Sequence, residues 1–255
     1  MTEPDVSTPY ATVVIVAAGR GERFGRPAKV LEIAGGRPLL AWSVEAATRA
    51  ECVHDLVIVS GEHTDEAIRT LLETMRLDKP VSVVPGGLRR QDSVAAGVAA
   101  VGEDIEVVLI HDGARPLAST HLFERCAAAV RRFGAAIVAI PVSDTLKRVE
   151  DLAIRETVSR AGLWAAQTPQ GFQRETIQAA IAQARIVDNE FTDEASLLEA
   201  LGHPVRIVPG EQTNIKVTHP EDLELIDALL WRRSRQAQEQ GDEHPTAIPE
   251  NRHWL

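Results

Sequence analysis

Short β-branched runs that alternate with helical segments constrain this chain more than any other feature of its sequence. Five runs have the apolar composition of strands that are buried on both faces, at 12–18, 55–60, 81–84, 107–111 and 135–140. Helical spacing fills the intervals at 38–50, 64–75, 92–101 and 122–133. Strands that alternate with helices over short connections predict an α/β domain, with a mainly parallel sheet and helices on both faces.

The alternation breaks after Pro141. Residues 141–149 and 154–165 have extended patterns on either side of a turn near Asp151, which predicts a β-hairpin that projects from the sheet. This segment, residues 141–165, is the arm. A lone hairpin is marginally stable in water, so we expect the arm to pack on something, and a partner subunit is one answer.

Helices resume after Gln173, and Thr192 or Asp193 can serve as the N-cap of a helix over 193–201. A strand is expected at 205–209 and a final amphipathic helix at 220–233. The predicted organisation is a flexible N-terminus at 1–10, a single domain at 11–233 and a disordered tail at 234–255, where polar residues dominate.

Composition excludes several classes of function. Lys and Arg number 27 and Asp and Glu 37, a formal charge of −10, whereas a general nucleic-acid binder needs a basic face. No apolar stretch approaches the ~20 residues of a membrane span, so neither nucleic acid nor a membrane is an expected partner. Cys52 and Cys126 lie far apart without nearby His or Cys, which argues against a disulfide framework or a zinc site and favours a cytoplasmic location.

The first candidate site follows the first strand, at residues 17–29. Gly19 and Gly21 come directly after the strand, where backbone N–H groups can approach a phosphate closely. Cations crowd the same segment of an acidic protein: Arg20, Arg23, Arg26 and Lys29. The segment matches neither the Walker motif nor the dinucleotide fingerprint. It indicates a nucleotide phosphate site, and the alternative is a surface turn with solvated arginines.

Two further candidate segments also follow strand ends. Gly86 and Gly87 give backbone access after the third strand, and Ser93 can hydrogen-bond a base or ribose near a helix start. Arg90 is either a phosphate clamp or half of a structural ion pair, and a plain capped helix start is an equal alternative for this segment. Asp112 follows the fourth strand and is a natural Mg²⁺ anchor or hydroxyl acceptor.

The residues around Asp112 and those farther along the chain leave more alternatives. Arg115 can pair with Asp112, and His111 is interpreted as a packed, hydrogen-bonded histidine outside the chemistry. Thr145 and Lys147 share one face of the arm, where an exposed polar ribbon is the plainer interpretation. Lys216 lies inside a short apolar run. It is either a charge that keeps an exposed sheet edge from pairing with another strand or a residue that contacts a ligand.

The joint order and spacing of these segments resemble one family, the 2-C-methyl-D-erythritol 4-phosphate cytidylyltransferases, over residues 12–230. The motifs are Ala-Ala-Gly-x-Gly-x-Arg-Phe, Gly-Gly-x-x-Arg-Gln-Asp-Ser-Val, His-Asp-Gly-Ala-Arg-Pro, Pro-Val-x-Asp-Thr-x-Lys, Leu-Trp-x-x-Gln-Thr-Pro-Gln, Thr-Asp-Glu-Ala and Asn-Ile-Lys-Val-Thr. The resemblance implies a Rossmann-like nucleotidyltransferase of isoprenoid biosynthesis that transfers CMP from CTP to methylerythritol phosphate. It also implies Mg²⁺ as cofactor, pyrophosphate as second product and a homodimer with interlocked arms.

The resemblance also implies roles for individual residues. The catalytic residues it implies are Arg23, Lys29, Arg160 and Lys216, with Arg23 and Lys29 as the basic pair on the CTP phosphates. The implied CTP-binding residues are Ala17, Ala18, Gly19, Gly21, Gly86, Gly87, Arg90, Ser93 and Asp112. Those implied for methylerythritol phosphate are Asp112, Thr145, Arg160, Thr168 and Lys216, and Arg160 reaches across the dimer. Asp112 is the implied metal ligand. The family usually has Pro-Lys-Gln where this chain has Pro27-Ala28-Lys29, so the lysine stands one position later.

Two other functions compete with this expectation. A cytidylyltransferase for ribitol 5-phosphate or another polyol phosphate would share the glycine loop and differ in its acceptor pocket. A non-catalytic nucleotide-binding protein could use the same fold. The presence of both Arg23 and Lys29 argues against the second, because binding alone needs no pair that stabilises a transition state. An oxidoreductase that uses a dinucleotide is excluded by the missing third glycine and acidic ribose partner.

Overall fold

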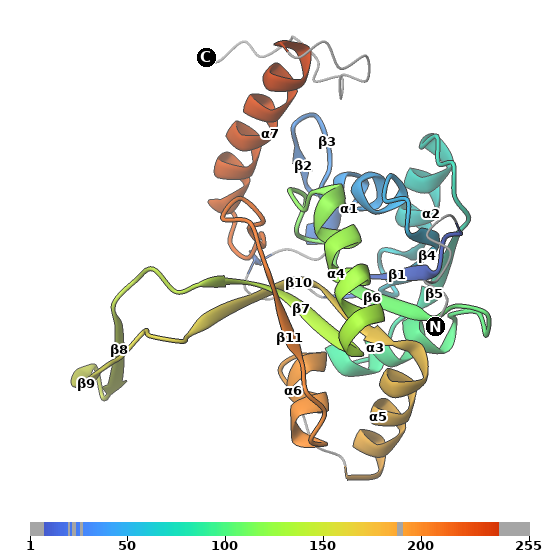
Figure 1. The fold of residues 1–255 in the computed structure, drawn as a ribbon. Coiled ribbons are helices and arrows are strands. Elements are labelled where there is room, and N and C mark those ends of the chain that lie inside the picture. The colour runs from blue at the N-terminus through green and yellow to red at the C-terminus, as the bar shows by residue number, and fades with distance from the viewer. Residues whose placement is uncertain (1–7, 20, 22–23, 26–27, 188–190, 240–255) are drawn as a thin grey trace, which may run out of the picture.

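The computed structural model describes residues 8–19, 21, 24–25, 28–187 and 191–239. Its centre is a seven-stranded sheet of order β11-β7-β10-β6-β1-β4-β5 (Figure 1). The strands are β1 (Ala11–Val16), β4 (Val53–Ser60), β5 (Val81–Pro85), β6 (Val107–Asp112), β7 (Ala135–Pro141), β10 (Trp164–Gln173) and β11 (Arg206–Pro209). The predicted α/β class and mainly parallel sheet are confirmed.

Four neighbouring strands form the half of the sheet that carries the candidate loops. β1 pairs in parallel with β4 and with β6, and β4 pairs in parallel with β5. Val16 at the end of β1 lies opposite Val59 of β4 and Asp112 of β6. The carboxyl ends of these strands therefore meet at one edge of the sheet, the place where ligands bind in open α/β sheets.

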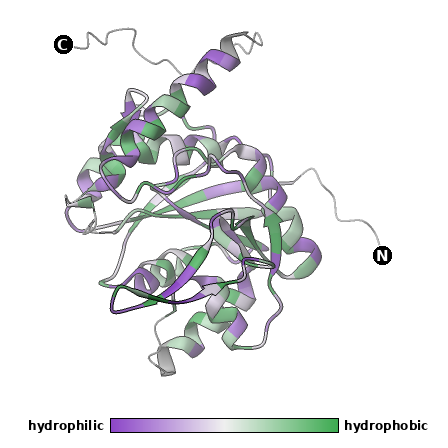
Figure 2. Cartoon of the chain, turned by 90° about the vertical axis from the view of Figure 1, so that its left-hand side faces the viewer, coloured by the Kyte–Doolittle hydropathy of each residue, from purple (hydrophilic) through white to green (hydrophobic). Residues whose placement is uncertain are grey.

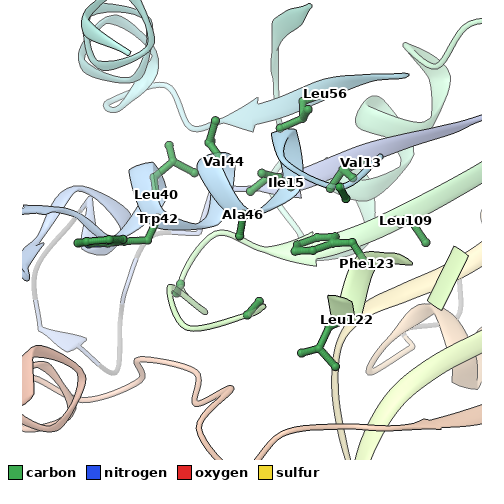
Figure 3. Close-up of a cluster of buried hydrophobic side chains, with 14 of the residues drawn as sticks. Val13, Ile15, Leu40, Trp42, Val44, Ala46, Leu56, Leu109, Leu122 and Phe123 are labelled. Atoms are coloured by element: carbon green, nitrogen blue, oxygen red, sulfur yellow. The ribbon is translucent and has the colours of Figure 1, made fainter. Parts of the chain in front are cut away.

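Helices cover both faces of the sheet, as predicted. Val13 and Ile15 of β1 pack with the first group of helices and Val14 packs with the second, because successive strand residues point to opposite faces. Figure 3 shows Val13 and Ile15 in one cluster with Leu40 and Phe123, which belong to two helices of the first group. The first group is α1 (Leu39–Thr48), α2 (Asp65–Thr74), α4 (Thr120–Phe133) and α7 (Asp222–Glu239), and the second is α3 (Arg90–Ala99), α5 (Arg174–Val187) and α6 (Glu194–Ala200).

The sequence interpretation missed the inner part of β10. The expected extended segment at 154–165 is followed by a strand that runs antiparallel between β7 and β6. Its inner half carries polar side chains where a buried strand normally shows an apolar run. Gln167 and Gln170 are nonetheless buried, because Nε2 of Gln167 donates to the Glu211 carbonyl and Nε2 of Gln170 to Asp193. Because β10 is antiparallel to both of its neighbours, the sheet is mixed. The strand was missed because its sequence has no regular spacing of hydrophobic residues.

The arm forms the predicted hairpin, with β8 (Leu146–Glu150) antiparallel to β9 (Ala153–Val158). Asp151 and Leu152 make the turn with positive φ. The arm projects from the body in Figure 1. In Figure 2, where it points toward the viewer, hydrophobic and hydrophilic residues are mixed along it. Leu152 is 98% exposed and Ile154 is 64% exposed. The arm thus presents apolar side chains that its own subunit does not cover.

Both ends of the domain differ from the prediction. Tyr10 is held rather than loose, because its N–H donates to the Cys52 carbonyl and its ring lies 4.1 Å from the Arg131 guanidinium. The final helix runs on to Glu239, so the prediction of disorder from Ser234 is wrong for 234–239. Ser234 is buried and donates to the Leu230 carbonyl. Residues 1–7 and 240–255 lie outside the described residues. Within the described ranges, no helix is both long and apolar enough to cross a membrane.

The remaining elements are short and lie near the first candidate loop. They are the 3₁₀ turn η2 (Lys29–Leu31), β2 (Ile33–Ala34) and β3 (Arg37–Pro38). The Gly35 N–H between β2 and β3 donates to Asp227 of α7 at 2.7 Å. Helix α7 therefore fixes the small hairpin that follows η2.

Candidate active site

A cleft of about 410 Å³ opens at the carboxyl edge of the parallel strands. Loops that follow β1, β5 and β6 form it, together with the segment before α7. Its lining includes most of the predicted site residues: Ala18, Gly19, Gly21, Lys29, Gly87, Arg90, Ser93, Asp112 and Lys216. Ala17 and Gly86 lie behind it, where their N–H groups donate to Val59 and Ser60 carbonyls of β4. The structure therefore gathers four segments that are distant in sequence.

Glycines let the loops approach one another at this edge. A Cβ atom at Gly86 would lie 2.6 Å from Cβ of Ala18 and 2.8 Å from Oγ of Ser93. A Cβ at Gly87 would lie 2.4 Å from Cβ of Asp92. At Gly19 a Cβ would meet no atom of the described residues within 4 Å, and Gly19 itself lines the cleft. Bare backbone of this kind suits close contact with a phosphate or a base.

Lys29 reaches the cleft despite its shifted position in the sequence. Ala28, directly before it, adopts a left-handed conformation with φ of 67° and starts the 3₁₀ turn η2. The Lys29 Nζ then donates to the Val217 carbonyl at 2.6 Å. One cation thus bridges the first loop and the segment that carries Lys216. Arg23, its predicted partner, lies outside the described residues.

Asp112 anchors a cluster of charges at the end of β6. Its Oδ2 lies 2.9 Å from Nζ of Lys216 and 3.4 Å from Nε of Arg115. Burial alone would raise the pKa of Asp112, but the cations of Lys216, Arg115 and Arg90 lower it below its ordinary value. Asp112 is therefore a carboxylate at neutral pH, with only 11% of its side chain exposed.

Thr168 and His111 lie directly behind Asp112. Oγ1 of Thr168 accepts a hydrogen bond from the Asp112 N–H at 3.1 Å and is 2.9 Å from Nδ1 of His111. His111 is fully buried and packs edge-on against Phe123. Burial lowers the pKa of His111 to about 3, so the ring is neutral at physiological pH. The interpretation of His111 as a packed, hydrogen-bonded histidine is confirmed.

Arg90 forms the structural ion pair that the sequence offered as one alternative. Its guanidinium makes two hydrogen bonds to Glu194, at 2.7 and 3.0 Å, while the residue also lines the cleft. Glu194 is 5% exposed. Burial raises the pKa of Glu194, against the lowering effect of Arg90. Arg90 is thus half of a structural ion pair that joins α3 to α6 at the wall of the cleft.

Removal of this pair is expected to destabilise the domain. Glu194→Ala leaves the Arg90 charge without its partner, so the free energy of unfolding should fall by about 3 kcal/mol. Urea unfolding followed by circular dichroism measures the loss. Glu199 is an exposed glutamate on the same helix. Glu199→Ala is therefore the matched control and should change the free energy of unfolding little. Equal stability of the Glu194 and Glu199 variants would show that the pair contributes nothing.

The predicted arm residues lie apart from the cleft. Thr145 and Arg160 are exposed, and the Arg160 guanidinium donates to the Ser143 carbonyl at the base of the arm. Lys147 bonds to Thr157 of the facing strand. Among the described residues that line the cleft, none comes from the arm. The structure of one subunit therefore does not bring Arg160 and Thr145 to the other predicted site residues.

Sequence reasoning missed two contributors to the site. Arg115 was interpreted only as a partner of Asp112, yet its Nη1 also donates to the Asn214 carbonyl at 2.7 Å and so fixes the segment that carries Lys216. Asn214 is fully buried and donates to the Thr168 carbonyl at 2.9 Å. The sequence signal for this segment was an asparagine and a lysine, Asn214 and Lys216, two residues apart in a short apolar run.

Comparisons with known proteins match this chain to one family. The family model of 2-C-methyl-D-erythritol 4-phosphate cytidylyltransferase matches residues 11–232. A relative of that name from Gloeobacter violaceus is 45% identical over 227 residues, which are 88% of this chain and 97% of the relative.

Solved structures give the same result. The 2-C-methyl-D-erythritol 4-phosphate cytidylyltransferase of Thermus thermophilus is 36% identical with a TM-score of 0.72, over 87% of this chain and 98% of that one. The 4-diphosphocytidyl-2C-methyl-D-erythritol synthase of Anaerococcus prevotii is 30% identical with a TM-score of 0.78, over 88% of this chain and 100% of that one. This chain therefore belongs to the 2-C-methyl-D-erythritol 4-phosphate cytidylyltransferase family.

Proposed function

We propose that the cleft transfers CMP from CTP to the phosphate of 2-C-methyl-D-erythritol 4-phosphate, which gives 4-diphosphocytidyl-2-C-methyl-D-erythritol and pyrophosphate. The observation that carries the proposal is the meeting of Lys29, Lys216 and Asp112 in one glycine-bordered cleft of an otherwise acidic protein. Ala18, Gly19, Gly87 and Ser93 hold the cytidine and its phosphates, and Lys216 holds the acceptor phosphate.

The chemistry requires charge neutralisation more than proton transfer. An oxygen of the acceptor phosphate attacks the α-phosphorus of CTP in line, a P–O bond forms, and pyrophosphate leaves with the bonding electrons. The attacking phosphate monoester is already largely ionised at neutral pH, so the reaction needs no general base. Lys29 and Arg23 stabilise the negative charge that spreads over the transferred group, because cations held beside developing charge lower the energy of the transition state.

Magnesium fits the residues that line the cleft. Asp112 is the acidic side chain among the described lining residues, and it is ionised. Mg²⁺ is commonly held by one or two carboxylates together with substrate phosphates and water. Asp112 would hold the ion with the CTP phosphates, and the bound ion would neutralise phosphate charge.

Metal removal is expected to stop the reaction. Treatment with EDTA should lower the rate of CMP transfer by about a hundredfold or more, because a phosphate-bound metal supplies several kcal/mol of charge stabilisation. Added Mg²⁺ should restore the rate, and Asp112→Asn should raise the Mg²⁺ concentration needed for half of the maximal rate. A metal-free enzyme that turns over at the original rate would contradict the assignment.

The arm supports a homodimer in which each subunit completes the site of the other. Leu152, Ile154 and Val149 are apolar and exposed on a hairpin that projects from its own subunit. A solitary two-stranded hairpin is marginal in water, so burial between two subunits would stabilise it. Arg160 and Thr145 of the second copy would then lie at the acceptor side of the cleft. The cytoplasm is the compartment we predict for this dimer.

A comparison of acceptors tests the proposal. CTP and Mg²⁺ are supplied with methylerythritol phosphate, with ribitol 5-phosphate or with no acceptor, and pyrophosphate release is followed. Release with methylerythritol phosphate alone is the expected result. Release with ribitol phosphate alone would keep the chemistry and change the substrate. CTP binding without release under any condition would favour a non-catalytic nucleotide-binding protein.

A further inference from the structure

The Thr168 hydroxyl joins two strands where their backbone pairing has stopped. β6 and β10 pair only as far as Ile110 opposite Gln170. Beyond that point Oγ1 of Thr168 accepts from the Asp112 N–H at 3.1 Å and contacts Nδ1 of His111 at 2.9 Å. The hydroxyl therefore holds the backbone of Asp112 at the position where this residue leaves the sheet and enters the cleft.

The two contacts of this hydroxyl are both with protein groups. A threonine hydroxyl has one proton to donate and two lone pairs that accept. One lone pair of Thr168 receives the Asp112 N–H, and the facing Nδ1 of His111 is the acceptor to which we assign its proton. Thr168 is only 3% exposed and does not line the cleft. Its side chain is thus engaged with Asp112 and His111 and is not part of the cleft lining.

Other contacts close a ring around the same point. Nδ2 of Asn214 donates to the Thr168 carbonyl at 2.9 Å, and the Asn214 carbonyl accepts from Arg115 at 2.7 Å. Arg115 in turn lies 3.4 Å from the Asp112 carboxylate. The backbone and the side chain of Asp112 are therefore held by separate parts of one network. His111 lies behind Thr168 in this network, fully buried and packed against the ring of Phe123.

We propose that His111 and Thr168 form a positioning pair for Asp112. His111 orients the Thr168 hydroxyl, and this hydroxyl fixes the Asp112 backbone, so that the Asp112–Lys216 pair keeps the geometry required for CMP transfer. The proposal rests on the proposed function of the cleft. It gives Thr168 an indirect role in place of the substrate contact that the family resemblance implied.

A double-mutant cycle tests the chain of contacts. His111→Leu and Thr168→Val should each lower kcat about tenfold, as loss of a supporting hydrogen bond around a site commonly does. KM for CTP should change by less than about twofold, because the contacts to CTP remain. The double variant should be no slower than Thr168→Val alone, since His111 acts through the hydroxyl. Thr168→Ser and His111→Asn keep the hydrogen-bonding groups and should recover most of the activity.

A second readout does not depend on activity. The Asp112 N–H should exchange with solvent at least about tenfold faster in Thr168→Val than in Thr168→Ser, because the valine side chain offers this N–H no acceptor. If His111→Leu fails to fold, Thr168→Val and Thr168→Ser can still be compared in kcat and in the exchange rate of the Asp112 N–H.

Two results would overturn the positioning pair. One is a double variant whose loss equals the product of the two single losses, which would mean independent packing effects. The other is unchanged exchange at Asp112 in Thr168→Val. A wild-type protein that exchanges as expected but transfers no CMP would instead contradict the proposed function, so the two failures are distinguishable.

Discussion

Lys29→Ala is expected to lower kcat for CMP transfer by about 10²–10³-fold, the usual loss when one preorganised donor to the transition state is removed. CTP affinity should fall less, by about tenfold, because one charged hydrogen bond among several is lost from the bound nucleotide. The structure supports the assignment, since Lys29 lines the cleft and its Nζ donates to the Val217 carbonyl at 2.6 Å. Steady-state kinetics and calorimetric titration with CTP separate the two effects.

Lys79 offers a matched control for this experiment. Its Nζ also donates to a backbone carbonyl, that of Ala50, at a place outside the cleft. Lys79→Ala removes the same kind of bond and should leave kcat near the wild-type value. Wild-type turnover in Lys29→Ala would refute the role given to this lysine, and equal losses in both variants would mean that the bond matters only for folding.

Mixed dimers of Arg160→Ala and Lys29→Ala subunits are expected to regain activity that neither variant has alone. In a mixed dimer of the proposed kind, one cleft contains an intact Lys29 and receives the arm that carries an intact Arg160. The second cleft contains both substitutions. Random mixing should therefore restore roughly a quarter of the wild-type specific activity, because half of the dimers are mixed and each has one intact site.

Purification through two different affinity tags isolates the mixed dimers for this assay. Arg155 is another arginine of the same hairpin and is paired with Glu150. Arg155→Ala is therefore the control, and it should have normal activity without mixing. Mixed dimers that stay as inactive as the parent variants would show that Arg160 acts within its own subunit or not at all.

The strands and helices that are marked by apolar runs or by helical spacing of apolar residues were predictable from the sequence. The five β-branched runs became β1, β4, β5, β6 and β7, and the helices fell in the expected intervals. Asp193 caps α6, with its side chain accepting from the Ser196 N–H at 2.9 Å. The arm was marked by the loss of alternation after Pro141. In each case local sequence, through burial or capping, decides the structure.

The parts that depend on distant partners were not predictable in the same way. β10 can be polar in sequence because Gln167, Thr168 and Gln170 each hydrogen-bond to a group far along the chain. The pairing of Asp112 with Lys216, and of Arg90 with Glu194, joins segments that no local pattern connects. For Arg90 the sequence supplied two alternatives, and the ion pair became visible only with the position of Glu194 on α6. Helix α7 passes the predicted end because Ser234 is buried, a tertiary effect.

The identity of the product tests the proposed reaction most directly. Wild-type protein is incubated with CTP, Mg²⁺ and methylerythritol phosphate, and the products are identified by mass spectrometry while pyrophosphate is quantified. We expect one diphosphocytidyl-methylerythritol for each pyrophosphate and no pyrophosphate without acceptor. Pyrophosphate released together with free CMP, or no product in the presence of bound CTP, would contradict CMP transfer to this acceptor.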